Sequence, residues 1–379
     1  MMRLGLWLAE KGFIPDFLLR IAIRKLSLSR LEDKSLLSEK SNIAASFKEG
    51  SIAEQTLEAN EQHYEVPPSF FTKVLGKNLK YSCCLYETQK ETLVEAEEKM
   101  LELYLSRAEI VDGQKILDLG CGWGSFSLFA AERFPKNSFT SISNSQDQID
   151  FITTEAKSRG LDNITALKAD INELNLEDKF DRIVSIEMFE HMRNYEKLLS
   201  KVANMLTENG KLFVHIFCHK DFLYPYEISG DADWMTKFFF LGGIMPSQDI
   251  FSYFSNDMTV IKDWKVNGTH YSLTSRDWLS NHYKNKKETL AMFANHYDDA
   301  NLWFQRWRIF FLTVEEFFKI NDGDEWSQDI FNYFSNDMTV IKDWKVNGKH
   351  YSLTSRDWLS NHYKNCLLYT SDAADEGHC

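Results

Sequence analysis

The sequence predicts an α/β fold with a doubly wound parallel sheet, and two observations support this prediction. Between residues 115 and 217, short apolar runs alternate with segments of helical pattern, and this alternation is typical of parallel sheets. The first apolar run, Lys115–Leu119, is followed by glycines at 120, 122 and 124 and then by the helical pattern of Ser125–Arg133. A strand, a glycine turn and a helix in this order place a ligand beyond the carboxyl end of the strand.

The remaining elements follow from the same patterns. Residues 1–62 have a helical pattern, and residues 218–246 form an aromatic-rich interruption that predicts a lid insertion. We therefore expect a helical cap over residues 1–110, which also supplies a segment that contacts substrate or cofactor, and a Rossmann-like core over 111–326. Further strands are expected over 138–143, 164–170, 181–187, 210–217 and 259–264, and helices over 146–160, 195–206 and most of 278–318.

An apolar stripe runs along the N-terminal helical pattern. Basic residues at 20, 24 and 25 lie opposite it. Such a stripe packs on a protein core or lies on a membrane surface, and we expect packing on the domain. Its members are Ile14, Phe17, Leu18, Ile21 and Ile23.

Net charge, cysteine spacing and apolar runs exclude several classes of function. The 379 residues carry a net charge of −13, which argues against a nucleic-acid partner. The six cysteines show no zinc-ligand spacing and no apolar run reaches 18 residues, so we expect no metal and no stable membrane insertion. Charged residues follow the short apolar run at 4–9 too closely for a signal peptide. We predict a cytoplasmic protein, with a homodimer as one possible state.

The glycine turn suggests a cofactor. A dinucleotide fingerprint needs Gly-x-Gly-x-x-Gly, whereas position 125 is Ser. The pattern Asp118-x-Gly-x-Gly-x-Gly is instead that of S-adenosylmethionine (SAM) methyltransferases, in which the Asp holds the methionine ammonium; a tight turn without a ligand is the alternative. Asp170, at the end of a predicted strand, is placed to bind the adenine amino group. Asn144 and Gln148 stand where an acid often binds the ribose hydroxyls.

A catalytic cluster is predicted at the end of the strand at 181–187. Glu187, Glu190 and His191 lie at its carboxyl end, where ligands bind in such sheets. An amine must lose a proton before it attacks a methyl group, and a His beside carboxylates is a suitable base. One His with two Glu and no second Glu-x-x-His does not match a metal site. A helix N-terminus that merely carries acids is the alternative.

Aromatic residues supply candidates for a substrate wall. Trp234 and Phe238 belong to the insertion, and Trp307 follows Trp303 by one helical turn. We predict that Trp234, Phe238 and Trp307 contact the substrate, although core packing would explain each of them equally well.

The C-terminal part contains a near-identical repeat. Residues 247–285 reappear as 327–365 with two differences, Ser252 against Asn332 and Thr269 against Lys349. Natural repeats diverge and tile in series, and the tail at 366–376 looks like translated adapter sequence. We therefore expect residues 327–379 to be an assembly artefact, with a true tandem duplication as the alternative.

Several long motifs, in order along the chain, resemble one enzyme family. Over about residues 10–326 the chain closely resembles the coclaurine N-methyltransferases, which belong with the cyclopropane-fatty-acid synthase superfamily of SAM-dependent enzymes. The motifs lie at 59–67, 75–82, 118–124, 185–191, 217–220, 242–247 and 264–271.

The resemblance implies a class I SAM-dependent methyltransferase sheet under a helical cap, with SAM as methyl donor and no metal. It implies a small, isoquinoline-like amine as substrate and Glu187, Glu190 and His191 as the catalytic cluster, with His191 nearest to a general base. Glu65 would bind the substrate amine. The implied cofactor contacts are Tyr81, Ser82, Asp118, Gly120, Gly122, Asn144, Gln148, Asp170 and Ile171.

Two departures from the family leave alternatives open. The lipid-modifying branch holds a bicarbonate base with a Cys, a Glu and a His, and Cys83, Glu190 and His215 occupy those positions here. Cyclopropane-type lipid methylation is therefore a second hypothesis. The family also continues after Trp326 into an apolar final strand, which the repeat replaces. We expect an exposed sheet edge there unless 339–344 fills the slot, and an incomplete chain that binds SAM without turnover is a third hypothesis.

Overall fold

The computed structural model describes residues 2–31, 35–54, 66–230, 233–319 and 327–335. The chain divides into two compact units, Met1–Asp337 and Met338–Cys379. The second unit lies outside the described residues, so the first unit alone is considered below.

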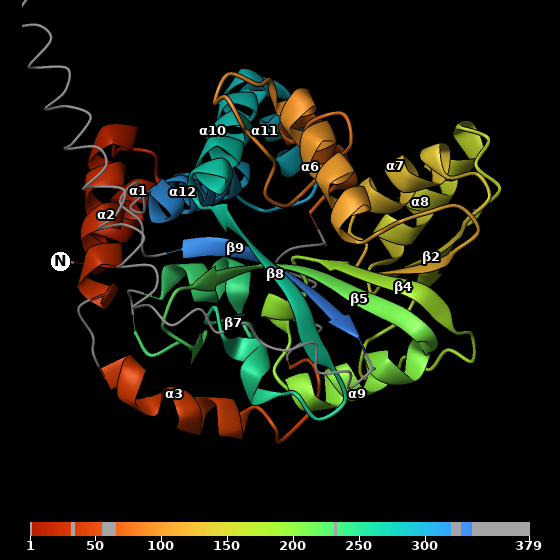
Figure 1. The fold of residues 1–379 in the computed structure, drawn as a ribbon. Coiled ribbons are helices and arrows are strands. Elements are labelled where there is room, and N and C mark those ends of the chain that lie inside the picture. The colour runs from red at the N-terminus through yellow and green to blue at the C-terminus, as the bar shows by residue number, and fades with distance from the viewer. Residues whose placement is uncertain (1, 32–34, 55–65, 231–232, 320–326, 336–379) are drawn as a thin grey trace, which may run out of the picture. The chain divides into compact units, whose positions relative to one another are not determined.

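A sheet with the strand order β3-β2-β1-β4-β5-β9-β8 forms the centre of this unit (Figure 1). The strands from β3 to β5 run parallel, while β9 is antiparallel to both β5 and β8. The predicted α/β fold with a doubly wound parallel sheet is therefore confirmed. The strands are β1 (Lys115–Leu119), β2 (Ser138–Ser143), β3 (Ile164–Lys168), β4 (Phe180–Ile186), β5 (Leu206–His219), β8 (Thr259–Asn267) and β9 (Ser327–Ser335).

Local sequence signals determine where the helix before β1 and the helices between the strands begin and end. Thr92 and Glu95 form a capping box at the start of α6, and the Asn194 side chain caps α9. Gly160 has a left-handed φ of 67° just beyond α8, as its place in the sequence predicts. These helices are α6 (Leu93–Arg107), α7 (Ser125–Arg133), α8 (Gln146–Ser158) and α9 (Tyr195–Met205).

Helices from both ends of the chain pack together. Figure 1 shows α1 and α2 beside α12, and both contact it. The N-terminal helices are α1 (Met2–Glu10), α2 (Asp16–Leu31), α3 (Ser35–Ser46) and α5 (Pro68–Val74). The C-terminal helices are α10 (Thr269–Lys284), α11 (Lys286–Ala294) and α12 (Ala300–Lys319).

The apolar stripe predicted at the N-terminus is only partly covered. Ile14 and Ile23 pack against the core, and the Arg20 guanidinium, from the side opposite the stripe, pairs with the Glu315 carboxylate of α12 at 2.7 Å. Phe17 and Ile21, however, are 62% and 60% exposed. The expected packing of the stripe on the domain is therefore confirmed for Ile14 and Ile23 alone, and α2 meets α12 partly through its basic side.

The aromatic-rich insertion at 218–246 packs beyond β5. Within it, β6 (Tyr224–Pro225) pairs with β7 (Ile244–Met245), and η2 (Thr236–Phe240) forms a short π-helical turn. The turn η1 (Phe189–His191) lies between β4 and α9, and η3 (Ile250–Tyr253) follows β7.

The second copy of the repeat supplies a strand. β9 lies between β5 and β8 and pairs with both, with His215 opposite Phe331 on one side and Trp264 opposite Phe331 on the other. The expectation of an empty slot and an exposed edge at this position is therefore wrong. The alternative strand at 339–344 lies outside the described residues.

The position of β9 predicts how truncation affects stability. A chain that ends after Trp326 lacks the strand that joins β5 to β8, so we expect its melting temperature to fall by roughly 10 °C or more. A chain that ends after Asp337 keeps β9 and should melt close to the full chain. Circular dichroism melts of the three proteins measure this difference, and equal melting temperatures for the two truncations would contradict the role of β9.

Candidate active site

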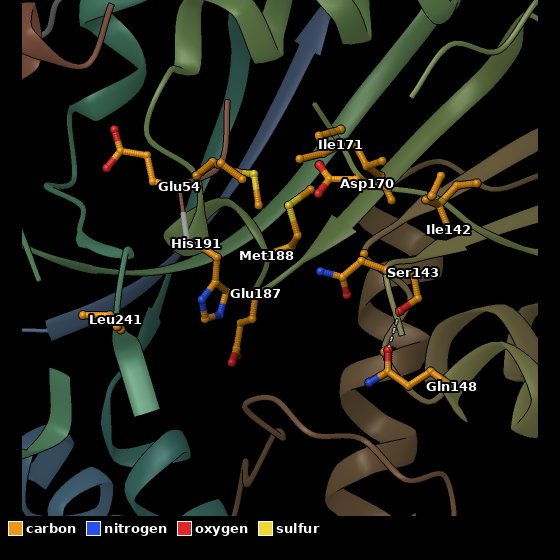
Figure 2. Close-up of a pocket in the computed structure, with 17 residues that line it drawn as sticks. Glu54, Ile142, Ser143, Gln148, Asp170, Ile171, Glu187, Met188, His191 and Leu241 are labelled. Atoms are coloured by element: carbon orange, nitrogen blue, oxygen red, sulfur yellow. Dashed lines mark hydrogen bonds between the residues drawn. The ribbon is translucent and has the colours of Figure 1, made fainter. Parts of the chain in front are cut away.

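Two adjoining cavities open at the carboxyl ends of β1, β2 and β4. The first spans about 830 Å³ (Figure 2) and the second about 540 Å³, and both volumes include space that is open to solvent. Gly120, Gly122, Gln148 and Glu187 line both cavities. The structure thus places a site where the strand–turn–helix pattern predicts a ligand.

The glycine turn brings the backbone close to these cavities. Gly120 has a left-handed φ of 82°, and a Cβ there would lie 2.5 Å from Cγ of Met188. Gly122 is also left-handed, with a φ of 52°, but a Cβ there would meet no atom within 4 Å. Gly120 is therefore needed for packing as well as for conformation, whereas Gly122 leaves open space for a ligand.

The first cavity gathers polar side chains from several strand ends. Figure 2 shows Ser143 and Gln148 on one side, His191 on the other, and Glu187 between them. The Ser143 hydroxyl donates to the Gln148 side-chain oxygen at 2.6 Å, which fixes that amide. The predicted residues in this lining are Gly120, Gly122, Asn144, Gln148, Asp170, Ile171, Glu187 and His191.

The second cavity contains a buried acid. Asp118 is 1% exposed, and its carboxylate accepts a hydrogen bond from the Ser127 hydroxyl at 2.6 Å. Loss of solvation raises the pKa of Asp118 to about 7. A cation bound in this cavity would therefore stabilise the charged form of Asp118. Tyr81 and Ser82 line the same cavity.

Glu187 is held at the boundary of the two cavities. Its φ of 48° is left-handed, which is unfavourable for a residue with a side chain. Its carboxylate accepts the Cys83 backbone N–H at 2.7 Å and the Tyr271 hydroxyl at 2.7 Å. The ring of His215 lies behind it, with Nδ1 4.0 Å from the same carboxylate. That nitrogen also lies 2.6 Å from the Tyr104 hydroxyl.

The other members of the predicted catalytic cluster have different surroundings. His191 lines the first cavity and stacks on Phe240, with ring centres 5.8 Å apart. Burial lowers the pKa of His191 to about 4, so the imidazole is neutral at physiological pH. Glu190 is fully buried and accepts the Phe217 backbone N–H at 2.9 Å. Glu190 is not among the residues that line the two cavities.

The predicted aromatic wall does not form at these cavities. Trp307 is completely buried and packs against Phe70, so it is a core residue. The Trp234 indole N–H donates to Glu10 of α1, and the Arg306 guanidinium lies over the Phe238 ring. None of the three predicted aromatics lines either cavity. Glu65 lies outside the described residues.

Sequence reasoning missed several residues of the site. Lys80 and Trp123 line the second cavity, and Tyr271 and Tyr104 complete the surroundings of Glu187. Lys80 directly precedes the predicted Tyr81-Ser82 pair, which was a usable signal. Tyr271 ends the motif at 264–271, but that motif does not place it beside Glu187, which lies 84 residues away in the sequence.

Two negative searches concern the described part of the chain. No group of three or more His, Cys, Asp or Glu residues there could hold a metal ion. Among the helices of the same part, none has the length and apolarity needed to cross a membrane.

Comparison with known proteins identifies the family. Residues 52–328 match the model of the mycolic acid cyclopropane synthetase family. The chain belongs to this family. It is a SAM-dependent methyltransferase, and its sheet is of the class I methyltransferase type.

Two relatives and one solved structure show how far the likeness extends. The (S)-coclaurine N-methyltransferases of Thalictrum flavum subsp. glaucum and Papaver somniferum are 38% and 37% identical to this methyltransferase, each over 84% of its length and over 91% and 93% of theirs. A crystal structure of coclaurine N-methyltransferase bound to N-methylheliamine and SAH superposes with a TM-score of 0.83 at 36% identity. That match covers 87% of this chain and 98% of the other.

Proposed function

We propose that this methyltransferase transfers the methyl group of SAM to the nitrogen of a small, isoquinoline-like amine. The observation that supports this most directly is the carboxylate of Glu187, which lines both cavities and is held by two hydrogen bonds. A fixed carboxylate where the two cavities meet would favour both the sulfonium of a cofactor that spans them and an amine cation bound beside it. The two coclaurine N-methyltransferase relatives support an amine as the cation on the substrate side.

The residues of the two cavities fit SAM. Asp170, Asn144 and Gln148 would hold the adenosine in the first cavity, and Asp118 would hold the methionine ammonium in the second. When bound, SAM supplies an electrophilic methyl group, and its sulfur is left as the thioether of SAH. Two observations support this fit. A Cβ at Gly122 would meet no atom within 4 Å, and Asp118 is a buried residue in the lining of the second cavity.

Glu187 and His191 would act on the amine. An alkylamine arrives protonated, and its nitrogen has no lone pair until the proton leaves. The Glu187 carboxylate would attract the ammonium. The His191 imidazole, whose pKa burial lowers to about 4, would take the proton only with the Glu187 charge beside it to stabilise the imidazolium. Figure 2 shows both side chains pointing into the same space. Glu190, bonded to the Phe217 backbone, would position η1 and with it His191.

The geometry argues against the bicarbonate hypothesis. An anionic base held near Cys83 and His215 would need hydrogen-bond donors there. The Cys83 N–H and the Tyr271 hydroxyl already donate to Glu187, and His215 faces that same carboxylate. A bicarbonate ion would meet a like charge at this position. The third hypothesis, an incomplete sheet, loses its basis because β9 fills the slot.

An assay with labelled methyl groups tests the proposal. The full chain is incubated with SAM carrying a labelled methyl group, a panel of cyclic secondary and tertiary amines, and unsaturated phospholipid vesicles. We expect label in the amine fraction alone. Label in the lipid fraction would overturn the proposal in favour of lipid methylation, and label in neither, with SAH still bound, would favour an inactive chain.

Substitution of Glu187 tests its role as the amine anchor. Because Glu187→Gln removes the charge and keeps the shape, we expect kcat/KM for the amine to fall by about a hundredfold or more. Glu54→Gln is the matched control, since Glu54 lines the first cavity and is exposed, and should change kcat/KM by less than about twofold. Equal effects of the two substitutions would refute the assignment.

The raised pKa of Asp118 predicts a pH dependence of cofactor binding. Below its pKa of about 7 the free carboxyl is protonated and cannot pair with an ammonium group. The dissociation constant of SAH should therefore rise about tenfold between pH 8 and pH 6. Binding of 5′-methylthioadenosine, which lacks the amino-acid end, should stay constant. Calorimetric titrations at each pH measure this, and parallel changes for the two ligands would contradict it.

A further inference from the structure

The second cavity contains a buried cation as well as the buried acid Asp118. Lys80 is 1% exposed and lines this cavity. Its ammonium donates to the Ser82 hydroxyl at 2.5 Å and to the Cys83 carbonyl at 2.6 Å, and it lies 4.9 Å from the centre of the Tyr104 ring. Both of these acceptors are uncharged, so neither neutralises the ammonium.

The buried acid closest in sequence to Lys80 is used by the backbone. Glu97 accepts the backbone N–H groups of Gly76, Asn78 and Lys80. Its oxygens therefore hold the turn that precedes Lys80, and its charge acts on the Lys80 ammonium only through space. The Lys80 side chain instead extends to Ser82 at the cavity wall. A buried charge of this kind is stabilised when an opposite charge binds beside it.

Three further donors point to the same chemistry. The indole Nε1 of Trp123, the hydroxyl of Ser125 and the side-chain Nε2 of Gln148 are buried without a hydrogen-bond partner in the structure. All three residues line the second cavity. Buried donors normally have acceptors, and leaving them unpaired is costly. With Gln148 assigned to the adenosine, Trp123 and Ser125 call for a group that accepts hydrogen bonds, and an ionised carboxylate is such a group.

We propose that Lys80 is the positive pole that recognises the carboxylate of the methionine end of the cofactor, with Ser82, Trp123 and Ser125 as neutral donors around it. This inference rests on the proposed use of SAM. It gives the second cavity two opposite poles, Lys80 and Asp118, which match the carboxylate and the ammonium of an amino-acid zwitterion. Neither the glycine turn nor the Tyr81-Ser82 pair supplies the positive pole.

The hydrogen bond between Lys80 and Ser82 explains how the pole would work. Because the Ser82 oxygen accepts from the ammonium, its own hydrogen is available for donation to a ligand. The ammonium strengthens that donation, since it draws electron density from the hydroxyl oxygen. Both groups are fixed before the cofactor arrives, so little side-chain freedom is lost on binding.

A structural role of Lys80 must be separated from this ligand role. Lys80 also holds the Cys83 carbonyl, and the Cys83 N–H holds Glu187. Loss of the ammonium could therefore loosen the catalytic segment without any direct effect on the cofactor. Measurements of activity alone would not distinguish the two roles, whereas ligands that lack single groups do.

Three ligands and two variants form the test. SAH has both the carboxylate and the ammonium, its decarboxylated analogue keeps only the ammonium, and 5′-methylthioadenosine has neither. We expect Lys80→Met to raise the dissociation constant of SAH about ten- to a hundredfold. The dissociation constants of the other two ligands should change by less than about twofold. Asp118→Asn is the matched control. It should weaken the binding of SAH and of the decarboxylated analogue, but not the binding of 5′-methylthioadenosine. Isothermal titration calorimetry on the full chain gives all nine affinities, including those of the unchanged protein.

The pattern of losses decides between the outcomes. If Lys80→Met weakened the binding of all three ligands equally, Lys80 would have a structural role and the inference would be overturned. An unchanged affinity for SAH would also overturn it. If SAH failed to bind the unchanged protein, the proposed function itself would fail. Should Lys80→Met not fold, Trp123→Phe removes one donor and keeps the ring. It should weaken SAH more than the decarboxylated analogue, and an equal effect on both would count against the inference.

Discussion

The site depends on one carboxylate, held where three distant parts of the chain meet. Glu187 directly follows β4 in a left-handed conformation, which costs roughly 1–3 kcal/mol for a residue with a side chain. The Cys83 N–H and the Tyr271 hydroxyl stabilise it there. The first comes from the segment before α6 and the second from the start of α10. Closure of these elements on the sheet and formation of the charged site are therefore one event.

The same carboxylate relates binding to turnover. Because Glu187 lines both cavities, it lowers the energy of a cation in either one. A sulfonium centre loses its charge as its methyl group leaves, so the carboxylate attracts the spent thioether less strongly than the methyl donor. Lys80 and Asp118, which also line the second cavity, would face groups whose charges the reaction does not change. The preference for SAM over SAH would thus come from Glu187. The affinity that SAM and SAH share would come from the buried charges of Lys80 and Asp118.

The parts of this arrangement that follow from short patterns could be predicted from the sequence. The glycine turn and the residues at the strand ends are local, and Asn144, Gln148, Asp170 and His191 all line the cavity that they were expected to line. Tyr271 could not be found this way, because it reaches Glu187 only through the fold. The substrate contact of Trp307 stays a prediction, because one-turn spacing on a helix predicts a shared face and not what covers it; in this structure Trp307 is buried against Phe70.

The repeat shows most directly why pattern alone is insufficient. Residues 247–255 and 327–335 differ only at Ser252 and Asn332, yet the first segment contains the short helix η3 and the second is the strand β9. The segment 247–255 ends three residues before β8, a length that allows a hairpin, so this segment could compete for the slot beside β5. Its aromatic side chains are used elsewhere: Phe251 and Phe254 are buried against Tyr195 of α9. Pulling this segment into the sheet would expose both rings, and that loss leaves the slot to the second copy.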